Sequence, residues 1–398
     1  MNKTKNKKIK KKKEKARHIE RPAEVAFYFG FTEISSPSIE KKDKDSIKWG
    51  KRGELNSEKK EDIYKAEEKA RILRLYFEDM KAFPQHYFLF YRKPLSGGSL
   101  KKRTSNYECG LDIIGSSKAV AEALVIQAAL SILSEEGFVD LEIIINSIGD
   151  KGSFTAFERE LIAYYRQNIE KFPTLCRQTF KKDIFEILRT EDEKCREAVA
   201  DAPQSLNLLS DSARLHFKEV LEFLESMGVP YTIDNHLIGN PFVTSHTIFE
   251  IQGTTKSGKK MLLASGYRYN DFSKKVGIKK EIPAVGISLS WKRSGKPAPR
   301  RLPKPIFYLV QLGTFAKFRS LPIIESLRKA KVPIFHALTK DKYGGQSGTA
   351  ENMRVPFLLI FGQKEAIENT IAVRDVKTRF QETTSLAKLP SYLKKLSS

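Results

Sequence analysis

The chain has 398 residues, of which 40% are apolar and 10% aromatic, and this composition excludes a wholly disordered protein. Its 71 Lys and Arg outnumber its 48 Asp and Glu, so the formal net charge is +23 and a phosphate-bearing polymer or an acidic surface is the expected partner. No stretch approaches about 18 consecutive apolar residues, so we expect no membrane span. The length predicts two or three folded units.

The first 17 residues carry ten Lys or Arg and one acid, Glu14. Because like charges repel and nothing apolar is present to be buried, residues 1–17 are predicted to be a disordered basic tail. A purely solubilising arm fits the sequence equally well. The rest of the chain still carries a net charge of +14. The densest run of the tail supplies candidates for RNA phosphate contact: Lys10, Lys11, Lys12 and Lys13.

Apolar spacing predicts helices and strands in a mixed order through the first 295 residues. The expected elements are a helix from about Arg21, a strand ending at Pro37, a loop over 41–61, a helical or mixed segment over 62–80, strands over 86–92 and 107–115, a helix over 118–137, a strand over 139–150, a mostly helical segment over about 153–228, and strands formed by TIFEIQ, MLLASGYRY and AVGISLSWK. Antiparallel strands interrupted by helices indicate an α+β fold.

The segment 292–305 changes sharply to Pro, Gly and basic residues and is typical of a linker. We place the core at 18–295, the linker at 296–304 and a second domain at 305–398. In that second domain strands and helices alternate, from the strand IFYLVQL to the closing helix PSYLKKL. This order predicts a compact α/β unit.

Two potential sites are excluded on pattern. The three cysteines, Cys109, Cys176 and Cys195, have unrelated spacings, so we expect neither a disulfide framework nor a zinc site, in a reducing cytosol. GTTKSGKK (253–260) nearly matches a phosphate-binding loop. However, Lys260 stands where a magnesium-binding hydroxyl is needed, and a strand-like segment follows. We predict an exposed β-hairpin turn there and no metal site in the chain.

The order of several segments resembles histidyl-tRNA synthetases, which are class II aminoacyl-tRNA synthetases. The segments are FGFTEISSPSIE, YECGLDIIG, AEALVIQAALSIL, INSIGD, HTIFE, GYRYNDF and PAVGISLSWKR, followed by the α/β unit. INSIGD is similar to the family's INSLGD, and Pro37 stands where the dimer-interface motif keeps its proline. The resemblance runs from about residue 18 to 398. It implies a class II antiparallel sheet core with a helical insertion, plus a C-terminal α/β anticodon-binding-like domain.

The same resemblance implies a cytoplasmic homodimer that binds tRNA and has no membrane segment. The interface motif would leave Phe29, Phe31 and Ile34 poorly covered in a monomer, although packing inside the core is the alternative. In the C-terminal domain, the residues suited to phosphate contact, stacking and base-edge contact lie around 340–354. They are Lys342, Tyr343, Gln346 and Arg354.

The family's catalytic strand motif FRYERP corresponds here to LFYRKP. Phe90 takes the place of an arginine that stabilises transition-state charge, unless a register shift lets Arg92 serve instead. The loop that follows ends in Glu108, where a glutamine would hold the substrate amine. LRPE is matched only by LRLY (73–76).

The histidine-specific pattern LVRGLDYYTGTVFE is replaced by LIGNPFVTSHTIFE. Gly239 replaces the arginine, Phe242 the aspartate, and Val243 and Thr244 the two tyrosines. The last class II motif, GxGxER, becomes SLSWKR, with Ser290 and Trp291 where adenine needs a close backbone approach.

Three arginines are remnant candidates for catalysis: Arg293, Arg92 and Arg268. Arg293 stands in the place of the arginine that contacts the γ-phosphate, and GYRYND retains Arg268 together with Tyr269. Core ion pairs are an equally good interpretation of Arg293 and Arg268.

Positions that build the scaffold persist, whereas positions that serve substrate chemistry are replaced together. We therefore predict a synthetase-like protein that does not activate histidine and that binds tRNA or another structured RNA, without a cofactor. One alternative is a divergent but active histidine–tRNA ligase, which would use ATP and magnesium. A second is the synthetase-like regulatory subunit of ATP phosphoribosyltransferase, a relative without the C-terminal domain.

Overall fold

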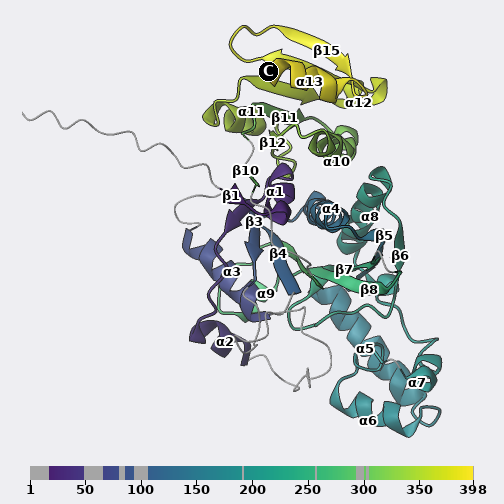
Figure 1. The fold of residues 1–398 in the computed structure, drawn as a ribbon. Helices are drawn as coiled ribbons and strands as arrows, with labels where there is room; N and C mark the ends of the chain where they lie inside the picture. Colours follow the sequence, from purple (N-terminus) through teal and green to yellow (C-terminus); the bar gives the residue numbers. More distant parts are fainter. Residues whose placement is uncertain are drawn as a thin grey trace, which may run out of the picture.

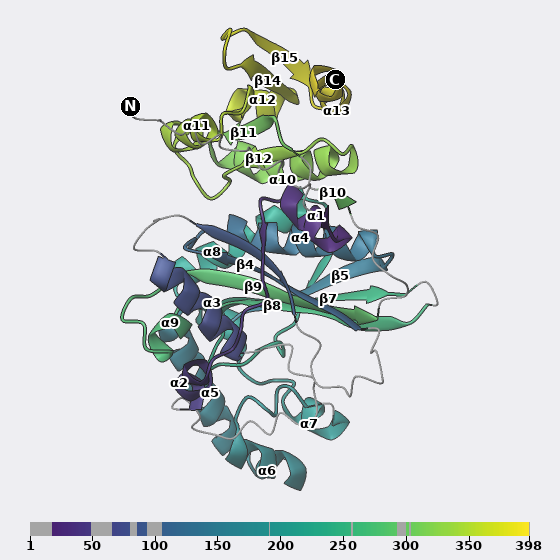
Figure 2. The same ribbon diagram turned by 60° about the vertical axis from the view of Figure 1, so that its left-hand side comes forward.

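The computed structural model describes residues 18–48, 66–79, 86–93, 106–190, 192–255, 258–292, 300–301 and 304–397. They form a core around an eight-stranded sheet and a C-terminal α/β domain stacked on one side of it (Figures 1 and 2). The antiparallel core and the C-terminal domain are as the sequence predicted.

The described part of the chain begins with a short strand, a helix and a second strand. These are β1 (His18–Ile19), α1 (Arg21–Tyr28) and β2 (Thr32–Ile34). Pro22 in the first turn suits a helix start, where its missing N–H is not needed. β1 pairs with β10 (Arg300–Arg301), so the segment after the basic tail is bound to the predicted linker.

The segment 41–61 was predicted to be a loop, and this was wrong for its first part, where α2 (Lys41–Lys48) forms. The Asp43 carboxylate accepts a hydrogen bond from the Glu40 backbone N–H at 2.7 Å and pairs with Arg74 of α3 (Ala66–Asp79). These contacts stabilise a helix that carries almost no apolar signal. Residues 49–65 lie outside the described part of the chain.

The central sheet has the strand order β2-β3-β4-β9-β8-β7-β5-β6, in which only the pairs β2–β3 and β5–β6 are parallel. The other strands are β3 (Tyr87–Arg92), β4 (Asn106–Ile114), β5 (Val139–Ser147), β6 (Tyr231–Ile233), β7 (Ser245–Thr254), β8 (Lys260–Arg268) and β9 (Ala284–Lys292). β7 and β8 pair up to Thr254 and Lys260. The hairpin predicted at 253–260 is therefore confirmed.

Helices cover both faces of this sheet (Figure 2). α4 (Val120–Glu135) is buried along nearly its whole length and lies on one face with α1 and α8 (Asp211–Ser226). The opposite face carries α3 and α9 (Phe272–Lys275). Residues Phe29 and Phe31 are 0% and 1% exposed within the single chain. The expectation that a monomer would leave them uncovered was therefore wrong, because the turn after α1 folds onto the core.

Between β5 and β6 the chain is helical, as predicted. It contains α5 (Lys151–Gln167), α6 (Thr174–Lys182), α7 (Glu193–Ala198), the 3₁₀ turn η1 (Ser205–Leu208) and α8. Cys176 of α6 and Cys195 of α7 form a disulfide with a Cα–Cα distance of 5.8 Å. This corrects the expectation from spacing alone, because the fold brings together two thiols that are 19 residues apart. Cys109 is free and buried.

The C-terminal domain has a five-stranded sheet in the order β12-β11-β13-β14-β15. Its elements are β11 (Phe307–Gln311), α10 (Thr314–Lys329), β12 (Ile334–His336), α11 (Tyr343–Asn352), β13 (Phe357–Phe361), α12 (Gln363–Glu368), β14 (Thr370–Asp375), β15 (Gln381–Ser385) and α13 (Leu389–Ser397). The sequence did not predict β15, since this edge strand reads QETTS and has no apolar alternation.

The C-terminal domain packs through α10 on the side of the core that carries α1, α4 and α8 (Figure 2). Phe318 of α10 contacts Phe223 of α8, with 4.4 Å between the centroids of the tilted rings. Arg328 pairs with Glu135 at the end of α4, at 2.9 Å. One hydrophobic cluster runs continuously from the core into this domain. Among the described residues, no helix is both long and apolar enough to cross a membrane.

Candidate functional site

The face of the central sheet that is turned away from α4 carries the candidate site. Because side chains alternate along a strand, Glu108, Gly110 and Asp112 of β4 share that face. Tyr91 is the cross-strand partner of Gly110, and Gly286 of β9 is the partner of Asp112. These positions and the helix α3, which packs on the same face, form the candidate site.

A buried polar group, which we call the Lys69 cluster, occupies this face. Lys69 Nζ donates to both carboxylate oxygens of Asp112, at 2.7 and 2.9 Å. The hydroxyl of Tyr269 donates to Asp112 at 2.6 Å, and the hydroxyl oxygen of Tyr91 lies 2.8 Å from the same carboxylate. The cluster consists of Glu68 and Lys69 of α3, Tyr91 and Lys93 at the end of β3, Asp112 of β4, and Tyr269 after β8.

The other carboxylate of the Lys69 cluster is also fully engaged. Glu68 accepts the Tyr91 hydroxyl at 2.7 Å and lies 3.1 Å from Lys93 Nζ, which in turn donates to Ser288 at 2.7 Å. Two carboxylates and two ammonium groups thus compensate one another, and every member of the cluster is at most 5% exposed. Buried charges persist only when they are paired in this way.

The backbone of the sheet is shaped to admit this cluster. A Cβ atom on Gly286 would overlap Asp112 Oδ1 and lie 2.8 Å from Lys69 Nζ. A Cβ atom on Gly110 would lie 2.7 Å or closer to the ring of Tyr91. The two glycines therefore leave the space that the ion pair and the tyrosine fill.

Burial and charge set the protonation of the cluster. Burial raises the pKa of Asp112, although Lys69 opposes this effect. Burial would also raise the pKa of Glu68, but Lys93 and then Lys69 outweigh it and the pKa is lowered. Burial, and next the Asp112 charge, raise the pKa values of Tyr91 and Tyr269 well above the ordinary value. Both tyrosines therefore keep their proton, which Tyr269 donates to Asp112 and Tyr91 to Glu68.

Arg92, a catalytic candidate from the sequence, lies on the other face of the sheet. Its side chain is half exposed, pairs with Glu20 at 2.9 Å and lies over the Tyr107 ring at 5.1 Å. Phe90 points the same way, into the cluster that packs on α4. Neither residue reaches the candidate site, whereas Tyr91 and Lys93 do. The register of β3, which the sequence left open, decides this.

Arg268 is a buried structural residue. Its guanidinium pairs with Glu122 of α4, and Nε lies 2.6 Å from Glu122 Oε1. His216 Nε2 contacts the same carboxylate at 2.6 Å. Burial alone would raise the pKa of Glu122, but Arg268 and then His216 hold it well below the ordinary value. The interpretation of Arg268 as a core ion pair is the one the structure favours.

The remaining arginine candidate, Arg293, lies outside the described residues. Two residues before it, Trp291 was predicted to stand where adenine needs space, and the structure corrects this. Trp291 is 3% exposed and packs against Tyr107 at 4.7 Å, on the α4 side of β9. Ser288 and Ser290 of β9 share the face of the candidate site with Gly286.

The segment 239–244 packs into the hydrophobic cluster beside the candidate site. Gly239 has a φ of +67°, and a Cβ atom there would lie 3.0 Å from Thr244 Oγ1. Val243 is 1% exposed, and Phe242 contacts Phe272 at 5.8 Å between ring centroids. These residues act as packing residues in this chain.

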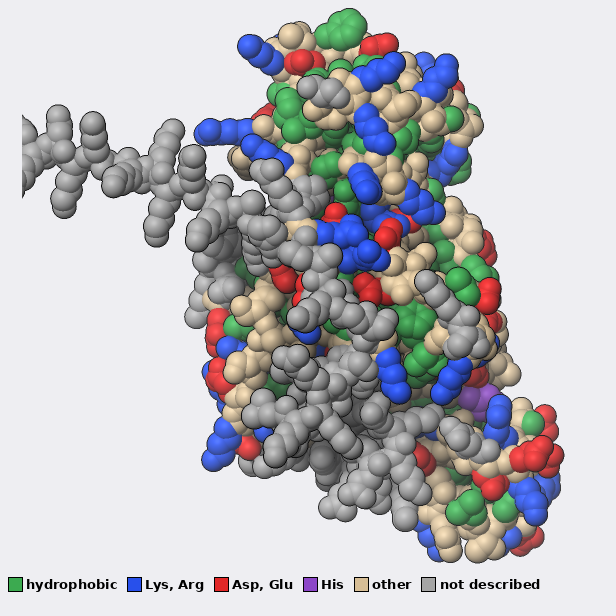
Figure 3. Space-filling model, in the orientation of Figure 1, with side chains coloured by type: hydrophobic (Ala, Val, Ile, Leu, Met, Phe, Trp, Pro, Cys, Tyr) green, Lys and Arg blue, Asp and Glu red, His purple; other side chains and the backbone are tan. Residues whose placement is uncertain are grey.

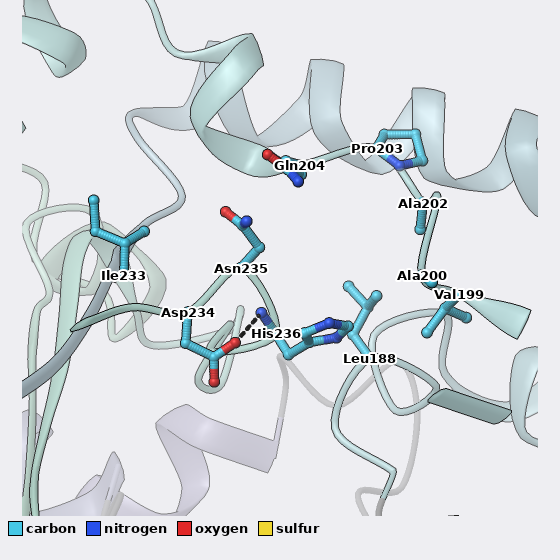
Figure 4. A pocket seen from close by; sticks show the side chains of 10 residues that line it. All are labelled: Leu188, Val199, Ala200, Ala202, Pro203, Gln204, Ile233, Asp234, Asn235 and His236. Carbon is cyan, nitrogen blue, oxygen red and sulfur yellow. Dashed lines mark hydrogen bonds between the residues drawn. The ribbon is translucent and has the colours of Figure 1, made fainter. Parts of the chain in front are cut away.

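Two cavities lie beside the helical insertion. One, of about 170 Å³, lies between the segment after α7 and the loop after β6 (Figure 4). Asn235 and Gln204 face each other across it, and the Asp234 carboxylate accepts the His236 backbone N–H at 2.8 Å. The other, of about 390 Å³, is lined by the start of α5, by 241–245 and by α9. Neither is lined by a member of the Lys69 cluster.

In the C-terminal domain, three of the four predicted RNA contacts are exposed. Lys342 and Arg354 are exposed, and Tyr343 is 42% exposed. Gln346 is the exception, since its amide is buried and bonds the backbone N–H and C=O of Gln311 at 3.0 and 2.8 Å. The prediction that Gln346 reads base edges is therefore wrong, because this amide ties α11 to β11.

The surface of the C-terminal domain is basic. Residues 305–398 contain fifteen Lys and Arg against seven Asp and Glu. In the space-filling view, Lys and Arg side chains are spread over this domain and gather at its boundary with the core (Figure 3). The tail lysines Lys10, Lys11, Lys12 and Lys13 lie outside the described residues. Within the described part, no group of three or more His, Cys, Asp or Glu could hold a metal ion.

Known proteins share this sequence pattern and this fold. A family model for an anticodon binding domain matches residues 320–396. The histidine–tRNA ligase of Bacillus subtilis is 29% identical over 74% of this chain and 70% of its own length. That of Latilactobacillus sakei is 27% identical over 93% of this chain and 91% of its own length. The crystal structure of apo S. aureus histidyl-tRNA synthetase shares the fold, with a TM-score of 0.50, 21% identity and coverage of 93% and 92%.

Proposed function

The chain belongs to the histidyl-tRNA synthetase family, and on that premise we propose that it binds tRNA or another structured RNA without activating histidine. RNA binding and histidine activation are two separate properties of such enzymes. The C-terminal domain would supply RNA binding, and the core would act as a scaffold. A cytoplasmic location is part of the proposal.

The observation that carries this proposal is the filled face of the central sheet. An enzyme that activates an amino acid needs fixed positive groups aimed at a phosphate, in a site that substrates can enter. Here Lys69 and Lys93, which lie on that face, are bound to Asp112 and Glu68 and are buried. Arg92 and Arg268 lie elsewhere.

The backbone of the segment 239–244 gives a second reason. The family's arginine would have to occupy position 239, whose φ of +67° lies in a region that side-chain-bearing residues rarely adopt. Restoring an arginine there would require another loop conformation, not only a longer side chain. This supports a loss of the histidine-specific pocket as a whole.

RNA binding is supported by the fold match and by charge. The region matched by the anticodon-binding model includes the exposed Tyr343 and Arg354, and the domain has a clear excess of basic side chains. Exposed aromatic rings and cations suit unpaired bases and phosphates. Phosphate contacts alone would give binding without specificity.

The main alternative is an active histidine–tRNA ligase that uses ATP and magnesium. What favours it is that relatives bearing that name match this chain over nearly its full length. In that case Arg293 and the loop before β4, both outside the described residues, would have to supply the catalytic charge. The regulatory-subunit alternative is disfavoured, because the C-terminal domain is present.

Histidine-dependent exchange of pyrophosphate into ATP separates the first two alternatives. We expect no exchange above the level measured without histidine. A rate in the usual enzymatic range, about 1 to 10³ per second, would refute the non-catalytic proposal. An active synthetase from the same family, assayed in parallel, controls for the conditions.

RNA binding is tested by the salt dependence of affinity. Deleting residues 2–17 should weaken all RNAs alike and flatten the dependence, with a slope change of about 0.7 for each phosphate that the tail neutralises on single strands. Deleting 303–398 should instead erase preference among RNAs. If the tail deletion changes neither slope nor affinity, the tail is only a solubilising arm, and the net charge of +14 on the rest of the chain must carry any RNA binding.

A homodimer remains a prediction of the family resemblance. It no longer rests on Phe29 and Phe31, which the single chain buries. A light-scattering mass of one chain at micromolar concentration would contradict it.

A further inference from the structure

The Lys69 cluster has the composition of a binding site for a primary ammonium group. The Asp112 carboxylate accepts from the Tyr269 hydroxyl, lies 2.8 Å from the Tyr91 hydroxyl oxygen and presents both of its oxygens to one cation. The ring of Tyr269 lies 5.6 Å from that cation, which is cation–π distance. A carboxylate, hydroxyls and an aromatic face around one point are the groups that recognise an ammonium.

The cation in this site belongs to the chain itself. Lys69 reaches it from α3, and its side chain is only 2% exposed. The glycine at position 286 leaves room for the ammonium, since a Cβ atom there would lie 2.8 Å from Nζ. The site is thus complete and already occupied.

We propose that Lys69 is a built-in occupant of an ammonium-binding site on the central sheet, and that this site accepts a free primary ammonium once the Lys69 side chain is shortened. The inference rests on the proposed function, because a chain that must bind a free amino acid on this face could not keep it filled. It adds to that function the identity of the residue that closes the site.

The energetic reason is the cost of unpaired buried charge. Shortening Lys69 to alanine leaves Asp112 without its cation and opens a space the length of three carbons and a nitrogen. n-Propylammonium has that length and that charge. It should therefore bind the variant, pair with the Asp112 carboxylate and occupy the space, as the native side chain does.

The experiment is thermal unfolding of the full-length Lys69→Ala variant with n-propylammonium chloride. We expect the variant to melt several degrees below the native chain, and the amine to raise its Tm by at least about 2 °C. Potassium chloride at the same concentration controls for ionic strength. n-Propanol controls for filling of the space without charge.

Two proteins serve as matched controls. The native chain should show no shift with the amine, since its site is filled. Lys260→Ala removes an exposed lysine that pairs with Glu142 at 3.2 Å, and it should show none either. A shift as large with propanol as with the amine, or no shift with the amine, would overturn the proposal.

A second variant keeps the test decisive if Lys69→Ala does not fold. The double variant Lys69→Met with Asp112→Asn removes both charges while keeping the volume, so it should fold and ignore the amine. Lys69→Ala should then refold only when the amine is present. If the double variant folds while the amine fails to restore the single variant, the proposal is wrong. Pyrophosphate exchange by the native chain tests the proposed function separately.

Discussion

Charged side chains of the central sheet and of the C-terminal domain are used in opposite ways. In the Lys69 cluster, Lys69 and Lys93 are buried and each is bound to a carboxylate. In the C-terminal domain, Lys342 and Tyr343 are exposed at the start of α11, and Arg354 is exposed beyond its end. A cation that is neutralised in the interior stabilises the fold, whereas one at the surface is available to a polyanion. The two regions should therefore respond differently to substitution.

The largest expected effect is in the interior. Asp112→Asn should lower the free energy of unfolding by about 3–5 kcal/mol, because the buried Lys69 ammonium loses the carboxylate that it bonds and keeps Glu68 at 4.0 Å. Urea unfolding of the full chain measures this, and RNA affinity in folded protein should not change. Lys260→Ala, at an exposed ion pair, should cost about 1 kcal/mol or less. Equal effects at the two sites would mean that the Lys69 cluster is open to water.

The disulfide should rank next. Cys176→Ser opens a bridge between residues 19 apart and should cost about 2–4 kcal/mol. Adding a reductant to the native chain should give the same stability as the variant, and neither change should affect RNA binding. A variant as stable as the native chain would show that the thiols are not paired in solution.

The contact between the two regions should depend on pH. Burial lowers the pKa of His336, which packs against Gly30 of the core, to about 4. Above about pH 6.5 the ring is neutral in both the folded and the unfolded chain, so its contribution is fully present. Between about pH 6.5 and 4 the unfolded chain takes up the proton first. Up to about 3 kcal/mol of stability is therefore lost as the pH falls.

Unfolding measured across this pH range, in the native chain and in His336→Asn, checks the assignment. The variant should lose part of the slope. His246, whose pKa burial also lowers to about 4, should account for another part. An unchanged slope in the variant would place the titrating group elsewhere.

The smallest effects are expected on RNA affinity. Tyr343→Ala should weaken binding of a single-stranded or loop RNA by about 1–3 kcal/mol if one base stacks on the ring. Lys342→Ala should lower the salt slope by about one, without changing preference among RNAs. Phe380→Ala is the matched control, because this ring is 67% exposed on the same domain. A larger loss of RNA affinity in Phe380→Ala would indicate that the RNA binds at the turn between β14 and β15.

Gln346→Ala tests whether a buried residue of α11 affects stability and not RNA binding. Gln346 lies three residues from Tyr343 but bonds the backbone of Gln311. We expect lower stability and unchanged RNA preference, as thermal unfolding and binding assays would show. A change in preference without a loss of stability would restore the original prediction for this residue.

Much of the fold was readable from local patterns. The helix α4 follows from apolar spacing over 118–137, and the hairpin at 253–260 follows from the strand that comes after it. The α2 helix and the β15 strand were missed because polar contacts and an edge pairing hold them, and neither leaves an apolar period in the sequence.

The sequence by itself determined most of the elements and the two-domain order, and it predicted the replacement of substrate-binding residues. Only the tertiary structure decided which face of β3 carries Arg92, that Arg268 binds Glu122, and that Lys69 meets Asp112. Those contacts join residues 43 to 146 positions apart. Periodicity fixes how neighbouring residues alternate, but strand register and helix packing fix which distant side chains share a face, and a charge can pair only with a group that shares its face.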